Sequence, residues 1–212
     1  MAKKIIEFIF ALADLINNDP AVNKYLKVVY LEDYNVSLAE ALMPTADFSE
    51  QISLAGTEAS GTGNMKLMIN GAVTLGTMDG ANVEIYDAVG KDNIIIFGMN
   101  AKEVDVLKKD GYNPGGYYRS SPEIRRVMDF INNGFCGKSF GELYSSILNS
   151  DTYMVLADFA DYRNAQRKAE ELWKNPDKLT RMSLMNIAGA GFFAADRSVN
   201  DYAKNIWGAD KL

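Results

Sequence analysis

The sequence contains no histidine and only one cysteine, Cys136, among its 212 residues. Without histidine the chain cannot build a Ser-His-Asp triad or a Cys-His pair. A zinc site is also disfavoured, because only carboxylates and one thiol remain as ligands, and we expect no metal site. One cysteine permits no disulfide within the chain, as is typical of cytoplasmic proteins. The remaining chemistry uses carboxylates, lysine, tyrosine, backbone amides or a cofactor.

Basic clusters and long apolar runs are also scarce. Acidic residues outnumber basic ones by 28 to 22, and basic pairs such as Arg125-Arg126 stand alone. This balance disfavours nucleic acid as a partner, since a phosphate backbone requires a basic face. No apolar run reaches the length of a membrane span. Residues 1–10 are broken by Glu7 and lack a signal-peptide cleavage site, so we expect a cytoplasmic protein.

The pattern of apolar residues changes along the chain. Strands are predicted over 27–31, 72–75 and 94–97, and helices over 4–17, 37–42, 64–70, 81–88 and 102–109. Further helices are predicted over 122–132, 140–149, 162–173, 176–188 and 199–207. Alternating strands and helices are typical of a mainly parallel α/β sheet. We expect a single domain over 1–212, with an α/β portion over 1–110 and a mostly helical portion over 111–212.

Four local signals within this pattern have structural interpretations. Lys27–Leu31 (KVVYL) is β-branched and aromatic, which predicts a buried strand. Ser37 is expected to cap the helix that Pro44 stops. The stretch GYNPGG at 111–116 is expected to be a loop. Asp79 is expected to be the N-cap of the next helix, with a polar role near a cleft as the less favoured alternative.

The most unusual stretch runs from Gly56 to Ile85 and begins GTEASGTGNMK. The P-loop pattern fails there, because Thr62-Gly63 stand where lysine and a hydroxyl residue are required. The dinucleotide-binding fingerprint fails too, because Lys66 occupies its last glycine position. What remains is a glycine-rich turn before a helix, whose free N–H groups suit an anion. An ordinary helix cap explains the same residues and is favoured by composition alone.

Lys66 is the one basic residue of this stretch. Apolar residues surround it in the sequence, which predicts a buried helix. A buried lysine must be paired, chemically modified or neutral. A neutral amine is what a Schiff base with an aldehyde cofactor requires. The alternative is a lysine that extends its ammonium group into solvent.

The stretch EQISLAGTEASGTGNMKLMINGAVTLGTMDGANVEI closely resembles the pyridoxal-phosphate segment of the α-glucan phosphorylases, which act on glycogen or maltodextrin. The resemblance continues through LEDYNVSLAE and MPTADFSEQIS before it, and GYNPGGYY, KNPDKLTRMSLMNIA and DRSVNDYAKNIWG after it. It implies an incomplete Rossmann-like domain of GT-B type, and mainly its latter part. Met1 matches an internal methionine of the family pattern, so we expect a fragment of a longer protein.

The resemblance also implies roles in holding pyridoxal 5'-phosphate. Lys66 would bind the cofactor covalently, and it and Thr62 are the expected catalytic residues. Thr62 and the amide of Gly63 would contact the cofactor phosphate, and Tyr34 would lie near the pyridine ring. Asn35 stands where some family members carry arginine, so no charged contact is expected there.

For the substrate, the resemblance implies that Glu58, Ser60 and Gly61 bind the glucosyl unit. The family reaction is phosphorolysis, in which inorganic phosphate releases a terminal α-1,4-linked glucose from a glucan as glucose 1-phosphate with retained configuration. The cofactor phosphate exchanges a proton with the substrate phosphate, which suits a chain without histidine. The expected partners are therefore an α-1,4-glucan and inorganic phosphate.

The family's cluster of basic residues around the two phosphates has no equivalent in this sequence. We therefore expect the chain alone to be inactive and to bind the cofactor poorly. If Lys27–Leu31 is an open sheet edge, self-association follows, in addition to a homodimer of the parent enzyme. Two alternatives stay open, a non-catalytic scaffold domain that keeps the fold and a nucleotide-sugar glycosyltransferase on a similar fold.

Overall fold

The computed structural model describes residues 1–209, which fold into two compact units. Unit 1 comprises Met1–Val36 and Lys109–Ala160, and unit 2 comprises Ser37–Lys108 and the chain from Asp161 onward. No helix among these described residues is both long and apolar enough to cross a membrane.

Unit 2 contains the sheet. Its elements are α2 (Val36–Leu42), η1 (Met43–Thr45), β1 (Phe48–Gln51), α3 (Gly63–Ile69), β2 (Val73–Gly76), α4 (Asn82–Val89), β3 (Ile95–Ile96), α5 (Ala101–Lys109), the second half of α9 (Val155–Trp173), α10 (Pro176–Gly189), η2 (Ala190–Phe193), α11 (Ala195–Tyr202) and η3 (Ala203–Trp207). In residues 1–209 the strands form one sheet of order β1-β2-β3 in which both pairs are parallel. The expected mainly parallel α/β fold is confirmed.

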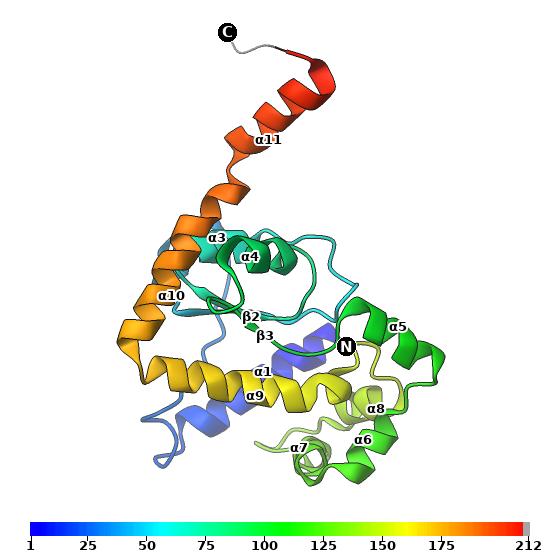
Figure 1. Ribbon diagram of the computed structural model, residues 1–212. Helices are drawn as coiled ribbons and strands as arrows, with labels where there is room; N and C mark the ends of the chain where they lie inside the picture. The colour runs from blue at the N-terminus through cyan, green and yellow to red at the C-terminus, as the bar shows by residue number, and fades with distance from the viewer. Residues whose placement is uncertain (210–212) are drawn as a thin grey trace. The chain divides into compact units, whose positions relative to one another are not determined.

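Helices cover both faces of this sheet. On one face, Val73 and Leu75 of β2 pack with Leu172 of α9 and Met182 of α10. On the other, α3 and α4 pack against β3, and the largest buried side chain there is Met68. Figure 1 shows α3 and α4 on one side of β2 and β3, with the second half of α9 on the other. Burial on both faces explains why the strands that were predicted correctly are continuous apolar runs.

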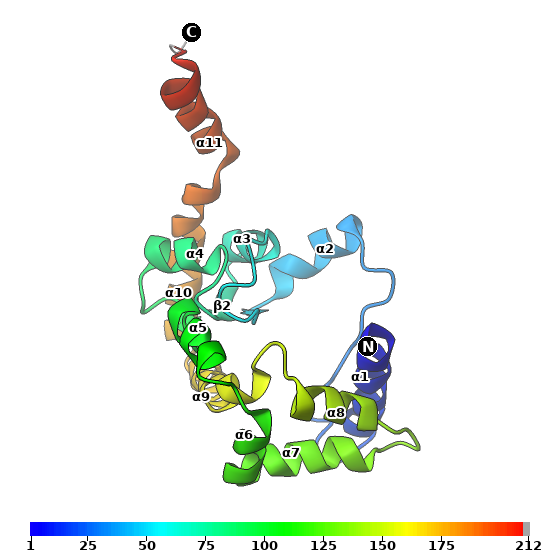
Figure 2. The same cartoon turned by 90° about the vertical axis from the view of Figure 1, so that its right-hand side faces the viewer.

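The last helices of the chain lead away from the sheet. In Figure 2, α10, η2 and α11 follow one another, and α11 extends away from the sheet. Large side chains are exposed in α11 and η3, and the rings of Tyr202 and Trp207 stack with centroids 5.9 Å apart. The helix predicted over 199–207 is present, but it begins earlier, at Ala195, and changes to a π-helical turn at Ala203.

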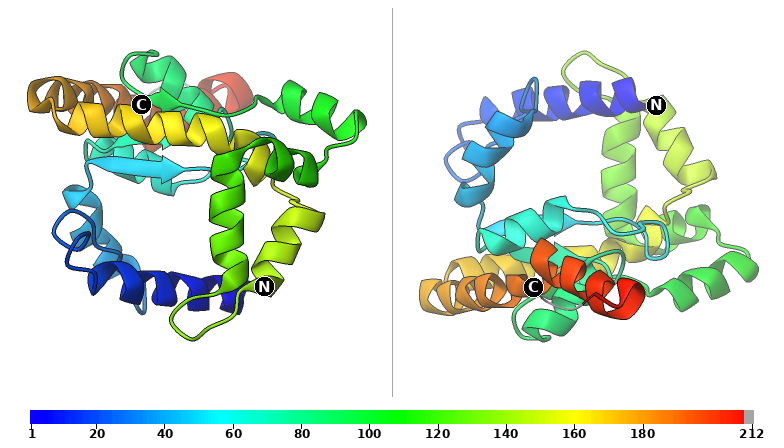
Figure 3. Two further views of the ribbon diagram at one scale, coloured as in Figure 1. Left: turned by 90° about the horizontal axis from the view of Figure 1, so that it is seen from below. Right: turned by 90° about the horizontal axis from the view of Figure 1, so that it is seen from above.

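Unit 1 is helical and has an aromatic core. It contains α1 (Ala2–Asn17), α6 (Pro114–Ser120), α7 (Pro122–Asn133), α8 (Gly141–Asn149) and the first part of α9. Both views of Figure 3 show the start of α1 beside α7 and α8. Phe140, fully buried, contacts Phe8 and Phe135 at ring-centroid distances of 5.1 and 4.8 Å. The Phe8–Phe140 contact is edge-on, and aromatic contacts of this kind add to the free energy gained by burial.

The predicted strand over Lys27–Leu31 is wrong. The segment has no regular structure, and Val29 is 71% exposed. The side chain of Asn17 donates to the carbonyl of Val28 at 2.8 Å and accepts from its N–H at 3.0 Å. These backbone groups are therefore satisfied without a neighbouring strand, and the apolar composition alone misled the prediction.

Two other local expectations need correction, and one is confirmed. Ser37 lies inside α2, which begins one residue earlier at Val36. The helix ends at Leu42 as predicted, and Pro44 belongs to the 3₁₀ turn η1 that follows it. The stretch 111–116 is only partly a loop, because Pro114 starts α6, and the side chain of Asn113 caps it by accepting from the N–H of Gly116. Proline at the first helical position is favourable, since its missing N–H would have no partner there.

Candidate functional site

The loop between β1 and α3 carries the predicted sugar-binding residues, and a buried carboxylate holds it. The Asp79 carboxylate accepts hydrogen bonds from the backbone N–H groups of Gly56, Thr57 and Glu58 at 2.8, 3.2 and 2.8 Å. Asp79 is only 8% exposed, so these amides satisfy its charge away from water. The N-cap prediction for Asp79 is wrong, because the N-cap of α4 is Ala81 and has no side-chain cap.

Two further contacts fix the same loop from the segment that precedes α4. The N–H of Ala81 donates to the carbonyl of Ser60 at 2.8 Å. Gly80 has φ +49°, and a Cβ built on it would lie 2.5 Å from that carbonyl oxygen and 3.0 Å from Cγ of Glu58. The loop therefore passes directly over Gly80, which only glycine permits.

A buried pair of asparagines links this segment to the start of α3. The Asn82 side chain accepts from Asn64 at 3.0 Å and donates to the carbonyls of Thr77 and Gln51 at 3.0 and 3.3 Å. Asn64 and Asn82 are each 3% exposed. Their side chains bridge β1, α3 and α4 beneath the loop.

The predicted cofactor-binding residues lie at the start of α3. Thr62 is the N-cap residue but makes no side-chain cap hydrogen bond, and its carbonyl accepts from the N–H of Lys66 at 3.2 Å. Four residues apart, Thr62 and Lys66 share one side of the helix. In the described part of the chain, the N–H groups of Gly63 and Asn64 have no hydrogen-bond acceptor.

Lys66 itself is exposed, which corrects the expectation of a buried lysine. The buried positions of α3 are Asn64 and Met68, so the helix buries one side and turns Lys66 outward. Among residues 1–209, its ammonium group has no hydrogen-bond or ion-pair partner. The structure therefore brings together Glu58, Ser60, Gly61, Thr62, Gly63 and Lys66 in one loop and helix start. Tyr34, the remaining predicted residue, belongs to unit 1, where it is 56% exposed.

Comparison with known proteins assigns the chain. A model of the carbohydrate phosphorylase family matches residues 1–209. The chain belongs to this family. It is 50% identical to human muscle glycogen phosphorylase and 47% identical to the sheep brain form, in each case over 99% of this chain and 25% of the relative. The chain thus spans about a quarter of the length of these relatives.

The hollow beneath the loop of this phosphorylase chain is small. It measures about 60 Å³ and is lined by Gln51, Ser53, Glu58, Ser60, Gly61, Asn64, Asp79 and Asn82. Ligand pockets usually measure about 300–1,000 Å³, so this hollow is too small for a sugar ring. It is the polar support under the loop, and Glu58 and Ser60 themselves lie at the surface.

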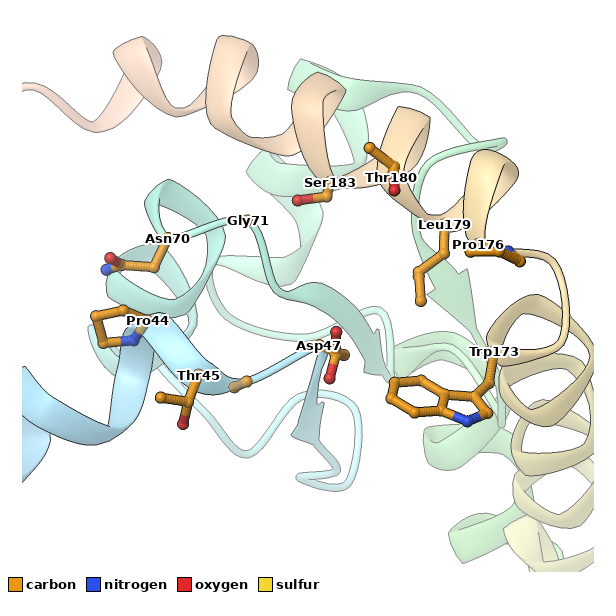
Figure 4. A pocket seen from close by; sticks show the side chains of 11 residues that line it. Pro44, Thr45, Asp47, Asn70, Gly71, Trp173, Pro176, Leu179, Thr180 and Ser183 are labelled. Atoms are coloured by element: carbon orange, nitrogen blue, oxygen red, sulfur yellow. The ribbon is translucent and has the colours of Figure 1, made fainter.

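A wider groove of about 420 Å³ lies at the opposite end of α3 (Figure 4). Asn70 and Gly71 follow α3 on one side, and the indole of Trp173 points toward Asp47 on the other. Leu179 and other residues of α10 complete the groove. None of the predicted site residues lines it, so this groove and the predicted phosphorylase site are separate features.

The sequence did not reveal the supporting role of Asp79, Asn82 and Asn64. Apart from the bond between Asn82 and Thr77, their supporting side-chain hydrogen bonds span 18 to 31 residues, and no local sequence pattern indicates such a contact. The available signal was composition: each of these three polar side chains requires a hydrogen-bond partner if it is buried.

Proposed function

We propose that this chain forms the cofactor-bearing region, and part of the sugar-binding region, of an α-glucan phosphorylase. The parent enzyme would phosphorolyse terminal α-1,4-linked glucosyl units to glucose 1-phosphate. The observation that carries the proposal is membership of the carbohydrate phosphorylase family over residues 1–209. The local geometry is compatible, because Glu58, Thr62 and Lys66 lie in one loop and helix start.

The start of α3 suits pyridoxal 5'-phosphate by its chemistry. It offers an amine without a partner at Lys66, a hydroxyl at Thr62 that is not used as a cap, and free N–H groups at Gly63 and Asn64. A Cβ at Gly63 would meet nothing within 4 Å, so the approach to this backbone is open. Backbone amides at a helix start favour a phosphate group. Lys66 would hold the cofactor covalently, and Thr62 and Gly63 would hold its phosphate.

The same loop would bind the glucosyl unit. In the described residues, the Glu58 carboxylate accepts no hydrogen bond, which leaves both oxygens for sugar hydroxyls. Ser60 and Gly61 would add backbone and hydroxyl contacts. When bound, the cofactor supplies a phosphate group that exchanges a proton with the substrate phosphate. Holding the sugar and the cofactor in fixed positions is then the task of this chain.

The isolated chain is proposed to be inactive and to bind the cofactor weakly. It covers only 25% of the length of its relatives, and it offers no Lys/Arg cluster for two phosphate groups. The glucan, inorganic phosphate, a homodimeric state and a cytoplasmic location are likewise proposals about the parent protein.

A chimera tests the parent function. The chain replaces its matching quarter of human muscle glycogen phosphorylase, to which it is 50% identical. We expect release of glucose 1-phosphate from glycogen and phosphate without any added nucleotide. Lys66→Ala should abolish the release, whereas Lys91→Ala, at an exposed lysine without a recorded partner, should leave it unchanged.

Each result separates the proposal from its alternatives. A folded chimera that releases no glucose 1-phosphate would support the scaffold alternative. A requirement for a nucleotide sugar would support the glycosyltransferase alternative. For the isolated chain mixed with pyridoxal 5'-phosphate, a strong absorbance band that disappears in Lys66→Ala would contradict the proposal of weak cofactor binding.

Self-association of the isolated chain is proposed on its exposed apolar side chains. In Tyr25–Leu31 of unit 1, Tyr25 is 81% and Val29 71% exposed. Exposed apolar patches of this kind favour contact with another chain. Light scattering at micromolar concentration should show species larger than a monomer, and a clean monomer would refute the proposal.

A further inference from the structure

The segment Asp79–Asn82 contacts both halves of the proposed site. These are the loop between β1 and α3, here called the sugar loop, and α3 itself, here called the cofactor helix. From the sequence, Asp79 was expected only to cap α4. The carboxylate of Asp79 binds three consecutive amides that end at Glu58. Ala81 binds the carbonyl of Ser60. Asn82 binds Asn64, two residues before Lys66. Within four consecutive residues, Asp79 and Ala81 thus bind the sugar loop and Asn82 binds the cofactor helix.

We propose that Asp79 is a positioning residue for glucosyl binding, one that sets the place of Glu58 through the loop backbone. This inference rests on the proposed function of the loop. Its basis is the geometry of three amide donors on one buried carboxylate, with no cation paired to it in the described residues. Hydrogen bonds to an ionised group are about twice as strong as neutral ones. No other side chain in unit 2 is recorded as binding the N–H of Gly56, Thr57 or Glu58.

The proposed sugar-binding residues and the proposed cofactor-binding residues are supported by different side chains. Asp79 contacts only the part of the loop before Ser60 and makes no recorded contact with Thr62, Gly63 or Lys66. The start of α3 is instead tied to α4 by the asparagine pair. Loss of the Asp79 carboxylate should therefore displace Glu58 while the cofactor-binding residues keep their place.

The test uses the active chimera and compares Asp79→Asn, Asp79→Ala and Glu84→Gln. An asparagine keeps one acceptor oxygen and can serve part of the loop, whereas alanine serves none. We expect kcat/KM for glucose 1-phosphate, in the direction of glucan synthesis, to fall at least about tenfold in Asp79→Asn and further in Asp79→Ala. Covalently bound cofactor at Lys66 should stay unchanged. Glu84→Gln removes the same charge from an exposed position of α4 and should match the wild type.

Gly80→Ala is an independent second variant, because its Cβ would press on the Ser60 carbonyl and on Glu58 without a change of charge. It should also lower kcat/KM for glucose 1-phosphate and leave the cofactor in place. If the variants of Asp79 and Gly80 keep the wild-type kcat/KM, the proposal is overturned. It is equally overturned if cofactor or folded state is lost in step with activity, because Asp79 would then serve folding alone. An inactive wild-type chimera would instead count against the proposed function.

Discussion

The two halves of the proposed site are built in different ways. The sugar loop is fastened by buried groups, since Asp79 holds three of its amides and Ala81 holds a carbonyl. The start of α3, only a few residues later, presents Thr62 and Lys66 to solvent without side-chain partners in the described residues. The loop proposed to bind the sugar is therefore held by groups within this chain, whereas the side chains proposed to bind the cofactor are not held by side-chain contacts in the described residues.

Among substitutions at the candidate site, the largest effect is expected at the asparagine pair that ties the start of α3 to α4 and β1. Asn82→Ala removes three side-chain hydrogen bonds and leaves the buried amide of Asn64 without its acceptor. Unsatisfied buried groups cost about 1–3 kcal/mol each, so the free energy of unfolding should fall by about 2–4 kcal/mol. Chemical denaturation measures this. Val83→Ala, at the partly exposed next position, is the control and should lose less than about 1 kcal/mol. An equal loss in both variants would show that the asparagine pair has no special weight.

Hydrogen exchange compares the two halves directly. The amides of Gly56 and Glu58 donate to a buried carboxylate, whereas those of Gly63 and Asn64 have no acceptor among residues 1–209. Exchange at Gly56 and Glu58 should be at least about tenfold slower, because their bonds must open first. In Asp79→Ala this difference should disappear. Similar rates at all four amides in the wild-type chain would mean that the loop is not fastened.

How well each element was predicted from the sequence depends on how far along the chain its contacts reach. The strands at Val73–Gly76 and Ile95–Ile96 were predicted to within two residues, because burial on both faces makes them apolar runs. The strand Phe48–Gln51 was missed, since Ser49 is buried but polar and Glu50 is charged and exposed. Lys27–Leu31 was wrong for the converse reason, because this largely apolar run forms no strand and the side chain of Asn17 binds the backbone N–H and carbonyl of Val28.

For the candidate site, the sequence predicted the local backbone structure better than the surroundings of its side chains. The glycine-rich loop, the helix start and their order were predicted from local pattern and resemblance. The exposure of Lys66 was not, because a seven-residue helix with mixed neighbours can turn either side inward. The role of Asp79 depends on a partner more than 20 residues away, which no local signal encodes.

The strand that leads into the sugar loop gives a pH-dependent effect of moderate size. Tyr162 of α9 donates to Glu50 of β1 at 2.9 Å, and burial together with the charge of Glu50 raises the pKa of Tyr162 to about 12. Because the unfolded phenol titrates near 10, this stabilisation is complete below about pH 10 and is lost as the pH rises through 12. Tyr162→Phe should flatten the fall in stability between these pH values. Tyr86→Phe, which lacks a recorded hydroxyl partner, should leave the fall intact.

The smallest effect is expected at Lys66, and its smallness is informative. Lys66→Met should change the free energy of unfolding by no more than about 0.5 kcal/mol, because an exposed amine without partners contributes little to the fold. Met68 lies on the other side of the same helix and is fully buried. Met68→Ala should therefore lower the free energy of unfolding by about 2–5 kcal/mol in the same denaturation experiment. A large change in the free energy of unfolding for Lys66→Met would mean that the amine makes a stabilising contact. It would contradict the view that Lys66 is free at the start of α3. A small change would show that Lys66 contributes little to the stability of the fold, as expected for an exposed amine without a recorded partner.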